Sequence, residues 1–114
     1  MTLTATQRAD LTATQAAGSN YLDRTAPEWR GQIDTAALDI AMNNRCIMGQ
    51  LCEGDYINGI RNYSPIRTAD THWAVMHGFY VDFTELTTFQ DDMDALSYLT
   101  ALWIADLQGW AAPV

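Results

Sequence analysis

The stretch that most constrains the fold runs from Asn43 to Ile60. It contains both cysteines of the chain and three of its seven glycines, set among apolar residues. A glycine inside a helix costs about 1 kcal/mol relative to alanine, so Gly49 in an apolar helical run predicts that another element approaches its backbone closely. Gly54 and Asp55 are typical of a helix stop followed by a helix N-cap. We therefore expect two short buried helices that serve as interior scaffolding.

Helical signals also flank this stretch. Thr4 and Gln7 form a capping-box pattern at the start of a helix that we expect to reach residue 24, with a break at Gly18. Apolar residues then recur at helical spacing from Met93 to Leu107 over four turns. The fold class predicted is mainly α, a small single-domain helical fold. Its expected parts are an N-terminal helical arm (1–20), a helical domain (21–110) with an irregular 65–88 segment, and a tail (111–114).

Two further segments complete the expected element order. Thr25 and Pro27 are predicted to begin a short helix in which Trp29 and Ile33 share one face. Residues 71–77 favour one or two helical turns, and the residues that follow alternate in a way that suits an irregular or extended segment over 78–83.

The charge of the chain limits its partners. Fourteen acidic residues stand against six arginines and no lysine, which gives a net charge of −8. Nucleic acids and anionic membranes require a positive surface on the protein, so neither is expected as a direct partner. No apolar stretch is long enough to span a bilayer, and no secretory signal pattern is present. We therefore expect a cytoplasmic protein with reduced thiols.

The residue types allow one metal set, formed by Cys46, Cys52, His72 and His77. Its cysteine spacing exceeds the two to four residues usual for zinc, and six residues along a helix rotate the two sulfur atoms about 120° apart. A cysteine nucleophile with a histidine base is the other chemistry these residues allow, but no local pattern brings such a pair together. We expect no metal and no cofactor, with the thiols packed as small apolar groups.

Catalytic signatures are missing from the sequence. It contains no GxSxG, Walker A or GxGxxG motif. The acidic run that ends at Asp94 lies where the N-terminus of a helix attracts negative charge, so helix capping explains it. We therefore expect a protein that is not an enzyme and has no catalytic residues.

Aromatic residues are numerous for a core of this size. Tryptophan and tyrosine are frequent anchors of binding surfaces, and the region 73–94 combines aromatic with acidic side chains. This region is predicted to form an exposed protein-binding surface. Its members are Trp73, Phe79, Tyr80, Asp82, Phe83, Glu85, Asp91 and Asp92.

The order and spacing of several residues resemble a known group of proteins. The pattern reads Tyr21-Leu22-Asp23, Pro27, Trp29, Ile33-Asp34, Leu38-Asp39-Ile40, Cys46-Ile47-Met48-Gly49-Gln50-Leu51, Gly54-Asp55-Tyr56, Gly59, His77-Gly78-Phe79, Tyr98-Leu99-Thr100, Trp103 and Leu107. It is similar to small proteins encoded by actinobacteriophages and their actinobacterial hosts. The resemblance implies a phage or host origin and a shared small fold, and it supplies no catalytic residues. Cys52 departs from the pattern, which has an aromatic residue there.

Two classes of function are consistent with these features. The first is a non-enzymatic phage-type accessory protein that binds a host or phage protein, or a second copy of itself in a homo-oligomer, through the 73–94 surface; a DNA mimic is one version of it. The second is a protein that sequesters a small ligand or nucleotide. Arg45, Arg61 and Arg67 would then contact the phosphate, because guanidinium groups match phosphate geometry.

Overall fold

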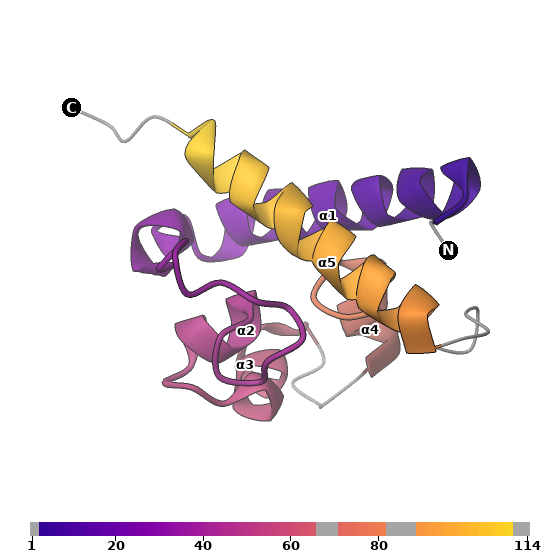
Figure 1. Ribbon diagram of the computed structural model, residues 1–114. Helices are drawn as coiled ribbons and strands as arrows, with labels where there is room; N and C mark the ends of the chain where they lie inside the picture. Colours follow the sequence, from indigo (N-terminus) through magenta and orange to yellow (C-terminus); the bar gives the residue numbers. More distant parts are fainter. Residues whose placement is uncertain (1–2, 66–70, 82–88, 111–114) are drawn as a thin grey trace.

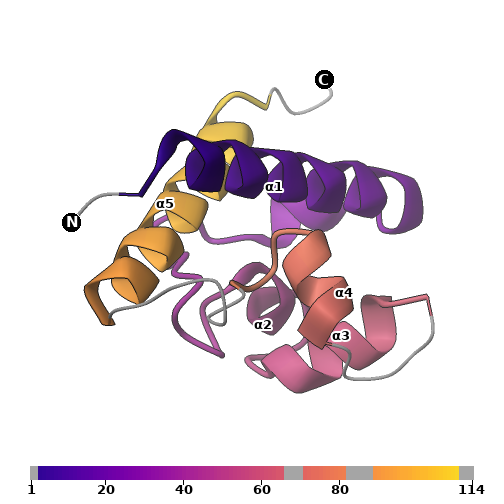
Figure 2. The same ribbon diagram turned by 90° about the vertical axis from the view of Figure 1, so that its right-hand side faces the viewer.

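Two long helices cross each other, and the shorter elements are arranged around them (Figure 1). The computed structural model describes residues 3–65, 71–81 and 89–110. The elements are α1 (Ala5–Thr25), the 3-10 helix η1 (Trp29–Gln32), α2 (Ile47–Leu51), α3 (Tyr56–Tyr63), α4 (Thr71–Met76) and α5 (Phe89–Gln108). The short helices α2, α3 and α4 lie on the same side of α1 (Figure 2). The predicted mainly α fold class is confirmed, and the described ranges contain no strand.

Helix α1 begins with the predicted capping box. The Thr4 hydroxyl accepts a hydrogen bond from the Gln7 amide at 3.1 Å, and the Thr4 amide donates to Gln7 Oε1 at 2.8 Å. The break expected at Gly18 does not occur, and the boundary expected at residue 20 falls inside the helix. Because Leu3, Gly18 and Ser19 are buried, residues 3–20 contribute to the main core.

The predicted helix start at Thr25 is wrong. Thr25 is the last residue of α1, and its hydroxyl donates to the Tyr21 carbonyl oxygen at 2.8 Å instead of capping a following turn. Pro27 disfavours the helical conformation at Ala26, whose φ is −145°, and α1 ends there. The next element is the single 3-10 turn η1, whose N-cap Glu28 makes no side-chain hydrogen bond to the turn.

The core is centred on Trp103 of α5, which is fully buried. Its ring lies edge-on to Trp29 with the ring centroids 5.7 Å apart, and it stacks on Phe79 at 5.5 Å. The indole N–H donates a hydrogen bond to the Gly78 carbonyl oxygen at 2.7 Å. One side chain therefore joins α5 to η1 and to the turn that follows α4.

Two glycines allow that turn to lie directly on α1. A Cβ atom on Gly18 would overlap the His77 carbonyl oxygen and would come within 3.1 Å of the Trp103 ring. A Cβ atom on Gly78, which has a φ of +70°, would lie 2.6 Å from the Cα of Gln15. The backbones of the turn and of α1 are therefore in contact at two points, and each point excludes any larger residue.

Most of α2 is buried, as the sequence predicts, whereas only Gly59 and Ile60 are buried in α3. Cys46 is the N-cap of α2, and its sulfur accepts a hydrogen bond from the Gly49 amide at 3.3 Å. A Cβ atom on Gly49 would overlap the Asn43 carbonyl oxygen, which confirms the close backbone approach expected there. Gly59 brings α3 against α2 in the same way, since a Cβ atom on it would lie 2.5 Å from the Met48 carbonyl oxygen.

The end of α2 also agrees with the prediction from the sequence. Gly54 has a φ of +86°, and Asp55 caps α3 by accepting a hydrogen bond from the Asn58 amide at 3.2 Å. From the body of α2, the Gln50 side chain accepts from the Asp34 amide at 2.6 Å and donates to the Asp34 carbonyl oxygen at 3.2 Å. This paired contact holds the loop after η1 against α2.

The C-terminal half agrees with its predicted helices. Helix α4 lies within the 71–77 segment, and α5 covers the apolar spacing from Met93 to Leu107. Residues 77–81 form an irregular turn, while residues 82 and 83 of the expected extended segment lie outside the described residues. None of the helices in the described part is long and apolar enough to cross a membrane.

We expect the Gly18→Ala variant to be less stable than the wild type by about 1–3 kcal/mol, the usual range for overpacking a close contact. Alanine has a higher helix propensity than glycine, so helix propensity alone predicts that the variant is more stable than the wild type. Urea unfolding followed by circular dichroism gives the free energy of unfolding.

Gly31→Ala is the matched control for this substitution. A Cβ atom on Gly31 meets no other atom within 4 Å, so we expect its stability to stay within about 0.5 kcal/mol of the wild type. A Gly18→Ala protein as stable as the Gly31→Ala protein would contradict the backbone contact between α1 and the 77–78 turn.

Candidate functional site

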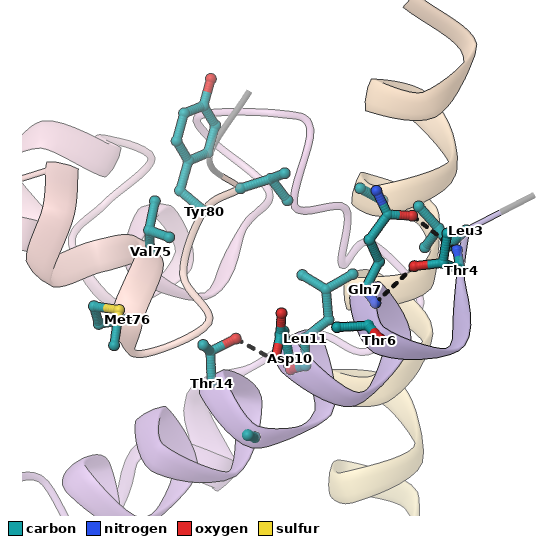
Figure 3. A pocket seen from close by; sticks show the side chains of 13 residues that line it. Leu3, Thr4, Thr6, Gln7, Asp10, Leu11, Thr14, Val75, Met76 and Tyr80 are labelled. Atoms are coloured by element: carbon teal, nitrogen blue, oxygen red, sulfur yellow. Dashed lines mark hydrogen bonds between the residues drawn. The ribbon is translucent and has the colours of Figure 1, made fainter. Parts of the chain in front are cut away.

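A groove with a volume of about 600 Å³ runs along the N-terminal half of α1 (Figure 3). Its walls come from α1 and the residues that precede it, from α4 and the turn that follows α4, and from α5. The residues that line it are Leu3, Thr4, Thr6, Gln7, Asp10, Leu11, Ala13, Thr14, Val75, Met76, Tyr80, Val81 and Ala95.

The lining of the groove is largely apolar. Leu3, Val81 and Ala95 are buried members of the core that also face the groove. In Figure 3, Val75 and Met76 lie on the side opposite the α1 residues. Met76 is 50% exposed, the largest value among the large apolar residues of the described part. An unbranched thioether beside an apolar lining is typical of surfaces that adapt to a bound partner.

The polar residues of the groove come from one face of α1. Positions three and four residues apart share a helix face, which places Thr6, Asp10 and Thr14 in a row. The Thr14 hydroxyl donates within the helix to the Leu11 carbonyl oxygen at 3.1 Å. Asp10 is the one lining residue that carries a charge at neutral pH, and among the described residues it has no ion-pair partner.

The predicted aromatic surface forms only in part. Tyr80 is half-buried and lines the groove, with its ring 5.7 Å from Tyr56. Trp73 is half-buried and stacks on His77, with the ring centroids 4.6 Å apart. The assignment of Phe79 to an exposed surface is wrong, because only 1% of this residue is exposed. Phe79 fills the core, where it stacks on Trp103.

The predicted acidic members of that surface are described only at Asp92. Asp82, Phe83 and Glu85 lie outside the described residues, and so does the side chain of Asp91. Asp92 is partly exposed and precedes Ala95 by three residues on α5, so the two are neighbours on the helix surface. Ala95 lines the groove, so Asp92 lies about one helical turn from the groove without being one of its lining residues.

Two of the three arginines proposed to bind a phosphate lie away from this groove. Arg45 lies in the loop before α2 and Arg61 lies in α3, and both are exposed. Neither lines the groove or the second cavity described below. Arg67 lies outside the described residues.

Arg30 is the charged residue that sequence reasoning missed. Its side chain is only 12% exposed, and it borders an open second cavity of about 490 Å³ with Asp23, Asp106, Gly109 and Trp110. The guanidinium group donates to Asp106 Oδ1 at 2.6 Å, to Asp23 Oδ1 at 3.3 Å and to the Ser19 hydroxyl at 2.9 Å. No local pattern announces this cluster, because its members are distant in the chain.

The Arg30 cluster holds the fold together. Partial burial by itself raises the pKa of Asp106, but hydrogen bonds from Arg30, Ser19 and Gln15 outweigh it, so the pKa lies below its usual value of 3.8. Burial alone lowers the pKa of Arg30, and its two carboxylate partners raise it overall. Each guanidinium nitrogen already donates a hydrogen bond within the protein. The cluster therefore links α1, η1 and α5 and leaves Arg30 committed to these internal partners.

The cysteines have packing and capping contacts. Cys46 is 2% exposed, and its thiol donates to the Asn43 carbonyl oxygen at 3.7 Å. Burial raises the pKa of Cys46, which keeps it protonated. Cys52 is partly exposed and accepts a hydrogen bond from the Asn62 side chain at 3.2 Å. Over residues 3–65, 71–81 and 89–110, no three His, Cys, Asp or Glu side chains are grouped so that they could hold a metal ion.

Comparisons with models of known protein families, with curated proteins and with solved structures give no significant match to this chain.

We expect the two thiols to react at very different rates. In the native protein, DTNB should modify one thiol per chain quickly, because Cys52 is accessible whereas Cys46 is buried and protonated. The second thiol should react only after unfolding in guanidinium chloride. A Cys52→Ser variant should lose the fast reaction, and two fast equivalents in the wild type would contradict the placement of Cys46.

We expect Asp106 to make the fold sensitive to acid. Its pKa is lowered in the folded protein, so its stabilisation is complete above its usual pKa and is lost as the pH falls through the folded-state value. Asp106→Asn should therefore lower the free energy of unfolding at pH 7 by about 1–2 kcal/mol and flatten the loss of stability below about pH 4.

Urea unfolding between pH 2 and pH 7 measures both effects. Asp10→Asn is the matched control, because Asp10 is exposed and unpaired in the described part. It should keep the wild-type dependence on pH. An Asp106→Asn protein with an unchanged acid slope would show that the Arg30 cluster does not stabilise the charged form of Asp106.

Proposed function

We propose that the protein acts without catalysis, by binding a partner protein through the groove between α1 and α4. The observation that supports this proposal is the half-exposed Met76 beside a largely apolar lining. Removing apolar surface from water is favourable by about 25 cal/mol of free energy for each Å² that a partner covers. This lining therefore favours a partner with apolar side chains. The resemblance to phage and actinobacterial proteins supports the role of an accessory protein that binds a host or phage protein in the host cytoplasm.

The chemistry of the groove supports binding over catalysis. Acid–base catalysis requires positioned groups that can exchange protons with a substrate, usually with a partner that orients them. Asp10 is the single carboxylate among the described residues that line the groove, and it is exposed with no ion-pair partner in the described part. Among the described residues that line the groove there is no cysteine, histidine, serine or basic residue.

The same chemistry weighs against the two alternatives. A nucleotide would need positive charge for its phosphate groups, and the described residues that line the groove supply none. A second copy of this chain would also carry a charge of −8, so the two copies repel each other at long range. The groove therefore fits a different protein better than a nucleotide or a homo-oligomer.

Affinity purification from the cells that produce the protein tests the proposal with two variants. We expect Met76→Lys to recover at least tenfold less of a stoichiometric partner than the wild type, because the lysine puts a charge over the apolar lining. Met42→Lys should recover as much partner as the wild type, since Met42 is 44% exposed and lies outside the groove.

Circular dichroism and thermal melts establish that both variants are folded. A partner that Met76→Lys retains, or that both variants lose equally, would contradict binding through the groove.

A further inference from the structure

We infer that the segment bound in the groove is a basic amphipathic helix, with apolar anchors on one face and lysine or arginine beside them. This inference rests on the proposed function and adds the chemistry of the partner. It follows from three properties of the groove, which are its length along α1, its lining and the sign of its charge.

The length of the groove suits a short helix. The groove follows α1 from Leu3 to Thr14, a distance of about 16 Å at 1.5 Å per helical residue. Three turns of a bound helix cover the same distance. Such a helix can lie in the space between α1 and α4 and place anchors spaced three and four residues apart on the lining.

The lining suits aliphatic anchors. Leu3 and Leu11 come from the α1 side, and Val75 and Met76 come from α4. Both sides of the groove therefore contribute aliphatic side chains, and Tyr80 is the single aromatic residue among the described residues that line it. Leucine, isoleucine or methionine side chains on the partner would bury apolar area against both walls. The flexible Met76 side chain can adjust to any of these shapes.

The charge of the groove is negative. Asp10 lies on the α1 side, and Asp92 lies next to Ala95 on α5. The nearest basic residue in sequence, Arg8, is turned about 200° around the helix from Asp10, and its guanidinium donates to the Leu3 carbonyl oxygen at 2.6 Å. A partner with lysine or arginine beside its anchors would meet these carboxylates and would also be attracted by the net charge of −8.

Other partners of similar shape fit this charge less well. An acidic helix would be repelled by Asp10 and by the net charge of the chain. An anionic lipid surface would be repelled for the same reason. Charge complementarity thus selects among the helices that the apolar lining alone would accept.

Two synthetic peptides of three helical turns test the inference. Both carry leucine at positions i, i+3, i+4 and i+7, and the flanking positions are lysine in one peptide and glutamate in the other. Fluorescence anisotropy with the full chain should give a Kd at least tenfold lower for the lysine peptide at low salt. The difference should shrink at high salt, where charges on the surface are screened.

Variants locate the effect on the groove. Asp10→Asn should weaken binding of the lysine peptide about two- to fivefold, the range of an exposed ion pair. Glu28→Gln is the matched control: Glu28 is exposed, lies outside the groove and makes no cap bond. It should leave the Kd unchanged. Met76→Lys should abolish binding of the lysine peptide.

Three results would overturn the inference. They are equal or tighter binding of the glutamate peptide, no binding of either peptide, and equal losses in the Asp10→Asn and Glu28→Gln variants. Each can occur while Met76→Lys still loses the natural partner, in which case binding through the groove stands and only the chemistry of the partner is wrong. If Met76→Lys keeps the natural partner, the proposed function itself fails.

Discussion

The hydrogen bond from the Trp103 indole to the Gly78 carbonyl oxygen is the interaction on which the rest of the structure depends. A buried indole N–H without an acceptor would cost about 1–3 kcal/mol, so the turn after α4 must reach the centre of the molecule. The turn reaches the centre only because Gly18 and Gly78 allow the backbone of the turn to contact the backbone of α1. Once the turn is fixed there, α4 lies beside α1 and Met76 faces the first half of that helix. The groove is therefore a consequence of how the core closes.

The two ends of the α1–α5 pair have different chemistry. Towards the C-terminal end of each helix, Arg30 joins them through Asp106 and Ser19, with its guanidinium group largely withdrawn from water. Buried ion pairs add little net stability once the cost of desolvation is counted, so we assign the Arg30 cluster mainly to fixing how η1, α1 and α5 meet. Towards the N-terminal ends, the same two helices leave apolar side chains beside open space. One end is closed by internal polar contacts, and the other is available to a partner.

Two of the residues that look reactive in the sequence, Cys46 and His77, make contacts inside the protein. Cys46 caps α2 and is buried, and His77 stacks on Trp73 while its Nδ1 lies 2.9 Å from the Trp73 carbonyl oxygen. The described lining of the groove consists mainly of threonine and aliphatic side chains, which have little chemical reactivity of their own, together with Gln7, Asp10 and Tyr80. A function based on binding is consistent with this difference between the interior and the groove, whose lining has few reactive side chains.

The sequence by itself determined the features that depend on neighbours along the chain. These are the capping box of α1, the apolar face of α5, the stop at Gly54 and the cap at Asp55, because propensity, capping and helical spacing act over a few residues. It also indicated a close contact at Gly49, although not at Gly18, where the neighbour is a turn some sixty residues away. Only the tertiary structure decided that Phe79 is buried, that Thr25 still belongs to α1, and that Leu3, Met76 and Ala95 share one groove. These outcomes depend on which distant segments pack together, and that is set by the summed burial of the whole core around Trp103.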